Sequence, residues 1–207
     1  MKLGDFIWRQ SHYVRPLYHA YWQELNRKLC ARKPGVPCVS GPFVAEHIST
    51  IGRIIKLGNV LEIGFNLGHS AYMMLDLGHA SRVTSIDIRE TDDMVKCVQQ
   101  IKEEFSNRFS FFHGDSNNHD HWLHLLRSDV FQTGFIDGSH DRSSVQEDIR
   151  LCKRLGCDHF IFDDMHEKTG PGVIPAIIEE GGLILIALVG CLGVFRLADG
   201  DIFHNKP

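Results

Sequence analysis

The pattern of apolar and polar positions divides the chain into an N-terminal helical segment and a longer alternation of strands and helices. In the first segment, apolar side chains recur every four residues on what would be one helix face: Tyr13, Leu17, Tyr21, Leu25 and Leu29. Pro16 fits the first turn of such a helix, where a missing N–H is tolerated. We expect residues 1–47 to form a helical segment with a linker or lid, and residues 48–207 to form the main domain.

From residue 48 onward, short apolar runs alternate with stretches of helical length. Five of these runs are interpreted as strands, at residues 59–63, 82–86, 108–113, 133–136 and 159–162. Strands separated by helix-length segments favour parallel pairing, with helices on both faces of the sheet. Two further runs, 183–188 and 192–197, are too close together for a parallel crossover and predict an antiparallel hairpin. The sequence therefore predicts an α/β, Rossmann-like sheet of five parallel strands followed by a hairpin.

Composition narrows the class of protein and its partners. A chain of 207 residues with 43% hydrophobic residues can bury a single core. The net charge of -4 gives no general attraction to nucleic acid or anionic lipid, and no apolar stretch reaches the roughly 20 residues that span a bilayer. The six cysteines form no Cys-x-x-Cys pair, which is typical of reduced thiols. We expect a cytoplasmic protein that acts on a small molecule, without nucleic-acid or membrane partners, and homo-oligomers are left open.

The first strand leads into a turn that contains two glycines. Glu62 and Gly64 end the strand, and Gly68 and Ser70 lead into a helix. Glycines let a ligand approach the backbone, and the helix start offers free N–H donors. Asn66 stands where a dinucleotide-binding loop needs a second glycine, and the Glu62 carboxylate suits the ammonium group of S-adenosylmethionine (SAM) better than a diphosphate. The loop therefore favours SAM over a nicotinamide cofactor.

Acidic side chains also follow the later strands. Asp87 ends the second strand, where an acid accepts hydrogen bonds from ribose hydroxyls in doubly wound folds. Asp137 and His140 follow the fourth strand, and Asp163 and Asp164 follow the fifth. Because ligands of such sheets lie beyond the carboxyl ends of the strands, we expect the last four side chains to converge around the methyl group of SAM.

Three carboxylates at one site repel one another unless a cation or hydrogen bonds compensate their charge. Oxygen ligands suit Mg²⁺, and a divalent ion would lower the pKa of an acceptor hydroxyl and orient it for attack on the methyl carbon. His140 is the candidate base, because imidazole titrates near neutral pH. Asp163 and Asp164 can bind one ion only if the strand ends at Asp163 and turns. The alternative is that one of these aspartates, or Asp137, caps a helix or a loop.

Taken together, these motifs resemble the class I SAM-dependent methyltransferases, which implies a seven-stranded sheet. Asp137-x-x-His140 with the acidic pair after the next strand resembles the Mg²⁺-dependent macrolide-sugar O-methyltransferases, and catechol O-methyltransferases have a similar layout. The resemblance implies that Asp137, Asp163 and Asp164 hold the metal, with Asp137 also beside the cofactor, and that His140 is the base. It also implies that Asp115, after the third strand, reads the adenine amino group through its carboxylate or the neighbouring backbone.

The chain departs from these families at three positions of the candidate site. The sugar enzymes usually carry Glu where this chain has Asp163, and catechol-type enzymes carry Lys and Asn where it has His140 and Asp164. We predict a SAM-dependent, divalent-metal-assisted O-methyltransferase that acts on a hydroxyl of a small sugar, phenol or catechol. The alternatives are a non-catalytic SAM-fold binding module and a SAM-fold protein with other metal-dependent chemistry.

One helical stretch is assigned to packing and hydration alone. After the fourth strand, Val145, Ile149 and Cys152 have the spacing of an inward helix face. The polar residues between them are assigned to solvent: Gln146, Glu147, Asp148 and Arg150. We expect these four side chains to be hydrated.

Overall fold

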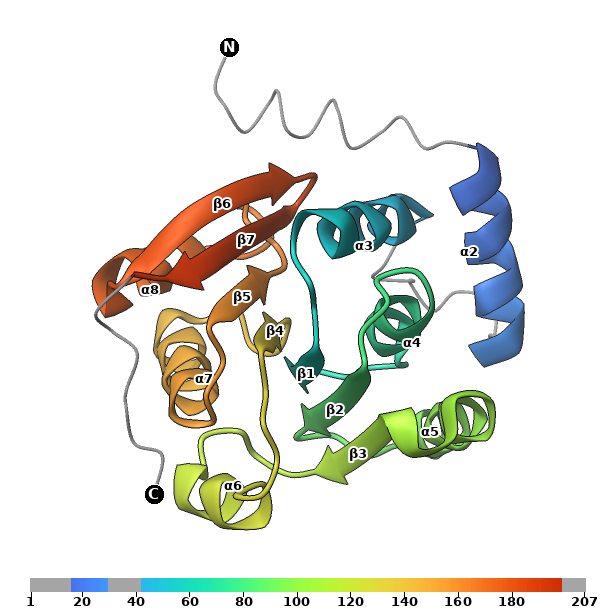
Figure 1. The fold of residues 1–207 in the computed structure, drawn as a ribbon, viewed down its shortest axis with the longest axis horizontal. Helices are drawn as coiled ribbons and strands as arrows, with labels where there is room; N and C mark the ends of the chain where they lie inside the picture. The colour runs from blue at the N-terminus through green and yellow to red at the C-terminus, as the bar shows by residue number, and fades with distance from the viewer. Residues whose placement is uncertain (1–15, 30–41, 199–207) are drawn as a thin grey trace.

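Seven strands form one sheet in the computed structural model, which describes residues 16–29 and 42–198 (Figure 1). The strands are β1 (Asn59–Ile63), β2 (Arg82–Asp87), β3 (Phe109–His113), β4 (Thr133–Ile136), β5 (His159–Phe162), β6 (Leu183–Val189) and β7 (Leu192–Leu197). Their order is β3-β2-β1-β4-β5-β7-β6. β1 to β5 are parallel, and β7 pairs antiparallel with both β5 and β6. The predicted α/β class, the five parallel strands and the C-terminal hairpin are confirmed.

Helices cover both faces of the sheet (Figure 1). On one face lie α3 (Pro42–Ile54), α4 (His69–Asp76) and α5 (Asp92–Phe105), with α2 (Pro16–Leu29) packed outside them. On the other face lie α6 (His119–Leu125), α7 (Arg142–Arg154) and α8 (Val173–Glu180), and the short 3-10 helix η1 (Ser106–Arg108) precedes β3. Side chains alternate between the two cores along each strand, as Val60 and Leu61 do on β1.

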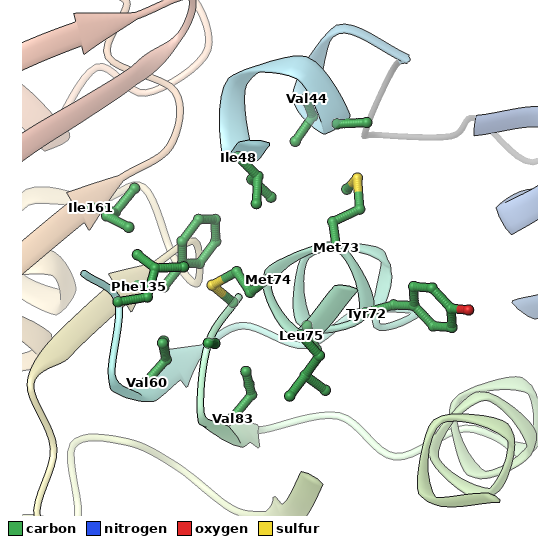
Figure 2. Packing of buried hydrophobic residues seen from close by; sticks show 14 of the residues in the cluster. Val44, Ile48, Val60, Tyr72, Met73, Met74, Leu75, Val83, Phe135 and Ile161 are labelled. Carbon is green, nitrogen blue, oxygen red and sulfur yellow. The ribbon is translucent and has the colours of Figure 1, made fainter. Parts of the chain in front are cut away.

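The core beneath α3 and α4 fixes how the strands lie against one another. Figure 2 shows the side chains that neighbouring strands and the two helices contribute to it, among them Val60, Val83, Phe135, Ile161, Ile48 and Met74. All six are at most 2% exposed. A slip of one residue in any strand would exchange its two faces, so this burial fixes the register. The carboxyl ends of β1 to β5 are thereby held at one edge of the sheet.

Helix α2 begins at Pro16, in keeping with the expected place of this proline in the first turn. Its buried face follows a period of 3.6 residues: Tyr18, Trp22, Leu25 and Leu29. Tyr21, which was predicted on this face, is half-buried, and its hydroxyl donates to Asp76 of α4. Tyr13 and the side chain of Leu17 lie outside what the structure describes. Leu25 and Leu29 are buried as predicted, and the strict four-residue spacing is wrong only at the preceding turn, where Trp22 is buried in place of Tyr21.

Contacts with α4 and α5 anchor helix α2 to the rest of the molecule. Lys28 donates to both Tyr72 and Glu104, at 2.8 and 2.9 Å. Asn26 Oδ1 lies 3.0 Å from Nε2 of His69, the first residue of α4. Helix α2 thus supports the start of α4, next to the turn after β1. Because α3 shares the same core, the division of the chain at residue 47 stays a prediction.

Several apolar side chains remain exposed on the edge strand β6. They are Ile184, Leu185, Ile186 and Leu188. The pairing of β6 with β7 shifts between Leu185 and Ala187, and an irregularity of this kind makes an edge less suited to pairing with a further strand.

Within residues 16–29 and 42–198, no helix has the length and apolar character needed to cross a membrane.

Candidate cofactor and active site

A cavity of about 520 Å³ lies at the carboxyl ends of β1 to β4. Most of the residues predicted to bind the cofactor line it: Gly64, Asn66, Ser70, Asp87, Asp115 and Asp137. His140, the predicted base, also lines the cavity. Glu62 and Gly68 contact residues that line the cavity, Ser70 and Phe65 respectively. Asp163 and Asp164 lie beside the cavity near His140. The fold therefore brings the separate sequence signals to one place.

Two glycines in the turn after β1 are required by contacts within the protein. Gly64 has φ 96°, and a Cβ atom there would lie 2.2 Å from the carbonyl oxygen of Asp137. Gly68 has φ 74°, and its Cβ would lie 2.5 Å from the ring of Phe65. Side chains are disfavoured at such φ values. The sequence explained these glycines by ligand approach, which stays a prediction, and the structure adds close packing of the turn against Asp137 and Phe65.

Glu62 is fully buried beneath this turn. Its carboxylate accepts a hydrogen bond from Ser70 Oγ at 2.5 Å and another from Ser85 Oγ on β2. Burial raises the pKa of Glu62 to about 8. Among the described residues, Ser70 lines the cavity and Glu62 does not. Glu62 is therefore connected to the cavity through its hydrogen bond with Ser70.

Asp87 connects the end of β2 to the turn after β1. Its Oδ2 atom accepts hydrogen bonds from the backbone N–H groups of Phe65 and Asn66, at 2.9 and 2.8 Å. Its Oδ1 atom accepts from the N–H of Arg89 at 2.8 Å. Each carboxylate oxygen has two lone pairs, so Asp87 retains acceptor capacity toward the cavity it lines. The same side chain can hold the turn and contact a ligand.

Replacing Asp87 by asparagine is expected to weaken binding of S-adenosylhomocysteine (SAH) about 10- to 100-fold. Two backbone N–H groups would lose a charged acceptor, and hydrogen bonds to charged groups contribute about 1.5–3 kcal/mol each. Isothermal titration calorimetry of both proteins measures the change. Asp93→Asn, at an exposed position of α5, is the matched control. An unchanged affinity in Asp87→Asn would contradict this role.

Asp115, predicted to read adenine, lies at the exposed edge of the cavity after β3. Its Oδ1 atom accepts from the N–H of Asn117 at 3.0 Å, and its carbonyl oxygen accepts from Trp122 Nε1 at 2.7 Å. Both contacts hold the local turn. The adjacent Ser116 donates through Oγ to Asp148 Oδ1 at 2.7 Å.

Asp148 corrects the prediction that the polar residues of α7 face solvent. It is 1% exposed, lies on the buried side of the helix and lines the cavity. Val145, Asp148, Ile149 and Cys152 share the spacing i, i+3, i+4 and i+7 of one helix face. The same spacing is present in the sequence, but the prediction gave more weight to the charge of Asp148 than to its position on the helix.

At the mouth of the cavity, His140 lies between two aspartates. Its Nε2 atom is 3.6 Å from Asp137 Oδ1, and its Nδ1 atom is 3.4 Å from Asp164 Oδ2. β5 ends at Phe162, and Asp164 has φ 53°, so the backbone turns at the acidic pair as a shared site requires. Asp163 Oδ1 accepts from the N–H of Asp164 at 2.7 Å and from the Cys191 thiol at 3.2 Å. Sequence reasoning gave no role to Cys191.

The carboxylates at this mouth are electrostatically crowded. Burial and the neighbouring aspartates raise the pKa of Asp163 to about 7, and burial also raises the pKa of Asp137. The Asp137 carboxylate in turn raises the pKa of His140. In the part of the chain that the structure describes, no three histidine, cysteine or acidic side chains are gathered in a metal-binding arrangement. His140 thus has a carboxylate near each ring nitrogen, an arrangement of titratable groups that can exchange protons.

Comparison with known proteins gives one matching family model and a set of similar folds. Residues 61–161 match the family model of a methyltransferase domain. No curated protein sequence matches the chain significantly. An O-methyltransferase from Bacillus cereus in complex with SAH has 15% sequence identity and a TM-score of 0.59, over 95% of this chain and 97% of that chain.

Two further solved structures are similar. CalS11, a TDP-rhamnose 3'-O-methyltransferase of calicheamicin biosynthesis, has 13% identity and a TM-score of 0.58, over 96% of this chain and 100% of that chain. The methyltransferase MycE of mycinamycin biosynthesis, in complex with Mg and SAH, has 14% identity and a TM-score of 0.52, over 89% of this chain and 54% of that chain. At these identities, the three structures establish the fold.

Proposed function

We propose that this protein is a class I SAM-dependent methyltransferase that transfers the methyl group of SAM to a hydroxyl group of a small molecule. The observation that carries the proposal is the position of His140 at the edge of the cavity, between Asp137 and Asp164. A base at that point can deprotonate a hydroxyl as it attacks a methyl group held in the cavity. Oxygen nucleophiles need such a base because the free hydroxyl is a weak nucleophile at neutral pH.

The cofactor would lie along the carboxyl ends of β1 to β4. Asp87 is the proposed acceptor for the ribose hydroxyls, because it lines the cavity at the end of β2. The turn at Gly64, Asn66 and Gly68 with Ser70 at the start of α4 would hold the amino-acid portion of SAM. Glu62 would act through Ser70, to which it is hydrogen-bonded. The methyl group would then point toward Asp137 and His140.

His140 is the proposed general base. Its Nε2 atom is buried and has no hydrogen-bond partner among the described residues, so its lone pair is not engaged by another group and can take up a proton. Asp137, next to this nitrogen, would stabilise the imidazolium that results, since a nearby negative charge favours the charged form. Asp164, next to Nδ1, would keep the ring in its orientation. The transferred proton is thus held at Nε2, beside Asp137.

We further propose that Asp137, Asp163 and Asp164 hold a divalent cation, with Mg²⁺ the ion that their oxygen atoms suit best. The chemistry of the donor set suits such an ion, because the mutual repulsion that raises the pKa of Asp163 would be offset by positive charge, but the three carboxylates would have to come closer together to share it. Oδ1 of Asp163 already accepts two hydrogen bonds, which leaves Oδ2 as its donor atom. Such an ion would lower the pKa of the acceptor hydroxyl and orient it. The Mg and SAH in the MycE structure support this proposal.

The acceptor is proposed to be a small sugar, phenol or catechol. A sugar is supported by CalS11, whose substrate is TDP-rhamnose. The net charge of -4 and the acidic mouth disfavour an acceptor that binds through many phosphate contacts. A neutral hydroxyl can approach His140 between the two carboxylates without this repulsion.

Incubating the purified protein with SAM and a panel of sugars, phenols and catechols tests the proposal. We expect SAH to form only when an accepted hydroxyl compound is present. Activity should fall on chelation and return when Mg²⁺ is added. Failure of the folded protein to bind SAM in calorimetry would refute the assigned cofactor. Turnover that is unchanged by the chelator would exclude the proposed metal but not the proposed methyl transfer.

A further inference from the structure

One carboxylate in the wall of the cavity has no part in the proposed reaction. Asp148 projects from α7, is 1% exposed and lines the cavity beside Ser116 and Gly138. Charged side chains are rarely buried without a partner that compensates their charge. Among the described residues, no cation forms an ion pair with Asp148. Its burial therefore calls for an explanation in terms of what the cavity holds.

The two oxygen atoms of Asp148 have different surroundings. Oδ1 accepts a hydrogen bond from Ser116 Oγ at 2.7 Å, which fixes the orientation of the carboxylate. Oδ2 accepts no hydrogen bond from the described part of the chain. Its neighbour is Gly138, where an added Cβ atom would lie 3.6 Å from Oδ2, at ordinary van der Waals distance. Burial raises the pKa of Asp148 to about 7, against the effect of the Ser116 hydrogen bond. A donor supplied by a ligand would offset this cost.

The position of Asp148 indicates which part of SAM would supply that donor. If the methyl group lies at Asp137 and His140 and the ribose at Asp87, the remaining portion of the cavity is bounded by Ser116, Gly138 and Asp148. The base of SAM is the remaining moiety, and its exocyclic amino group is a hydrogen-bond donor. Asp115, in contrast, is exposed, so water can satisfy its carboxylate without a ligand.

We propose that Asp148, oriented by Ser116, accepts a hydrogen bond from the exocyclic amino group of adenine and thereby selects adenine over 6-oxo purines. The proposal rests on SAM being the cofactor. It gives the role of reading the base to a buried carboxylate on α7 in place of the exposed Asp115. Selectivity follows because a 6-oxo group presents an acceptor to the carboxylate, and two facing acceptors in a buried site repel each other.

Calorimetry with two ligands tests this inference. SAH carries the 6-amino group, and S-inosylhomocysteine carries a 6-oxo group in its place. The wild-type protein should bind SAH about 10- to 100-fold more tightly, the range expected for loss of a hydrogen bond to a charged group. In Asp148→Asn, Ser116 would hold the amide oxygen and the amide NH₂ would face the base. The preference for SAH should then be lost or reversed.

Matched variants separate recognition from structural support. Glu147→Gln makes the same chemical change one residue earlier on α7 and should keep the wild-type preference. If Asp148→Asn does not fold, Ser116→Ala retains the carboxylate but frees it, and the ratio of the two affinities should decrease. Equal binding of both ligands by the wild type would overturn the inference and leave the cofactor standing. If Asp148→Asn weakens the binding of SAH and of S-inosylhomocysteine equally, the inference is also overturned. Absence of SAH binding would refute the proposed cofactor itself.

Discussion

Replacing His140 by glutamine is expected to lower kcat about 100- to 10,000-fold, the usual contribution of a positioned general base. Glutamine keeps much of the bulk of the ring between Asp137 and Asp164 but cannot accept a proton at neutral pH. The contacts proposed for the ribose and the base of SAM do not involve His140. Binding of SAH should therefore be little changed, and the loss should appear in turnover.

Single-turnover kinetics and SAH calorimetry on the same preparation distinguish these two effects. His124→Gln, at an exposed position of α6, is the matched control and should retain full activity. A kcat within a few-fold of wild type in His140→Gln would show that another group removes the proton. Parallel losses of kcat and SAH affinity would point to a structural role instead.

Replacing Gly64 by alanine should have the largest effect on cofactor binding and stability. A Cβ atom would lie 2.2 Å from the Asp137 carbonyl oxygen, and neither backbone can move without separating the ends of β1 and β4. A left-handed conformation costs an L-residue about 1–2 kcal/mol, and overpacking adds about 1–3 kcal/mol or more. We expect the free energy of unfolding to fall by the sum and SAH binding to be lost.

Gly156 provides a control that separates conformation from contact. Its φ of 93° is close to that of Gly64, but an added Cβ would meet only the carbonyl oxygen of Phe131, at 3.9 Å. Gly156→Ala should therefore show only the conformational cost, with SAH affinity preserved. Chemical denaturation and calorimetry on both variants measure the difference. Equal destabilisation of the two proteins would exclude the contact with Asp137 as the cause.

The strands could be predicted from the sequence because a parallel strand buried on both faces is apolar along its whole length. The parallel strands β1, β4 and β5 have the bounds that the apolar runs indicated, and so does the antiparallel strand β7. The predicted site benefited from the same regularity, because an acid that directly follows such a run must lie at the carboxyl edge of the sheet. Asp87 and Asp137 line the cavity for this reason.

What could not be predicted depends on partners that are distant in the chain. The burial of Glu62 requires hydroxyl groups from both α4 and β2, and neither contact leaves a trace in the local pattern. Asp148 was assigned to solvent because polarity was taken to decide exposure, whereas its helical position and Ser116 decide it. The Cys191 thiol reaches Asp163 only because β7 pairs with β5.

The place of β1 in the middle of the parallel strands has a consequence for thermodynamic linkage. Its neighbours β2 and β4 come from separate parts of the chain, and the cavity exists only when the ends of all three strands are assembled. A ligand of this cavity therefore binds the complete native state and not a fragment or a partly unfolded intermediate. At a concentration 100 times its Kd, such a ligand adds about 2.7 kcal/mol to the free energy of unfolding of the whole cooperative unit.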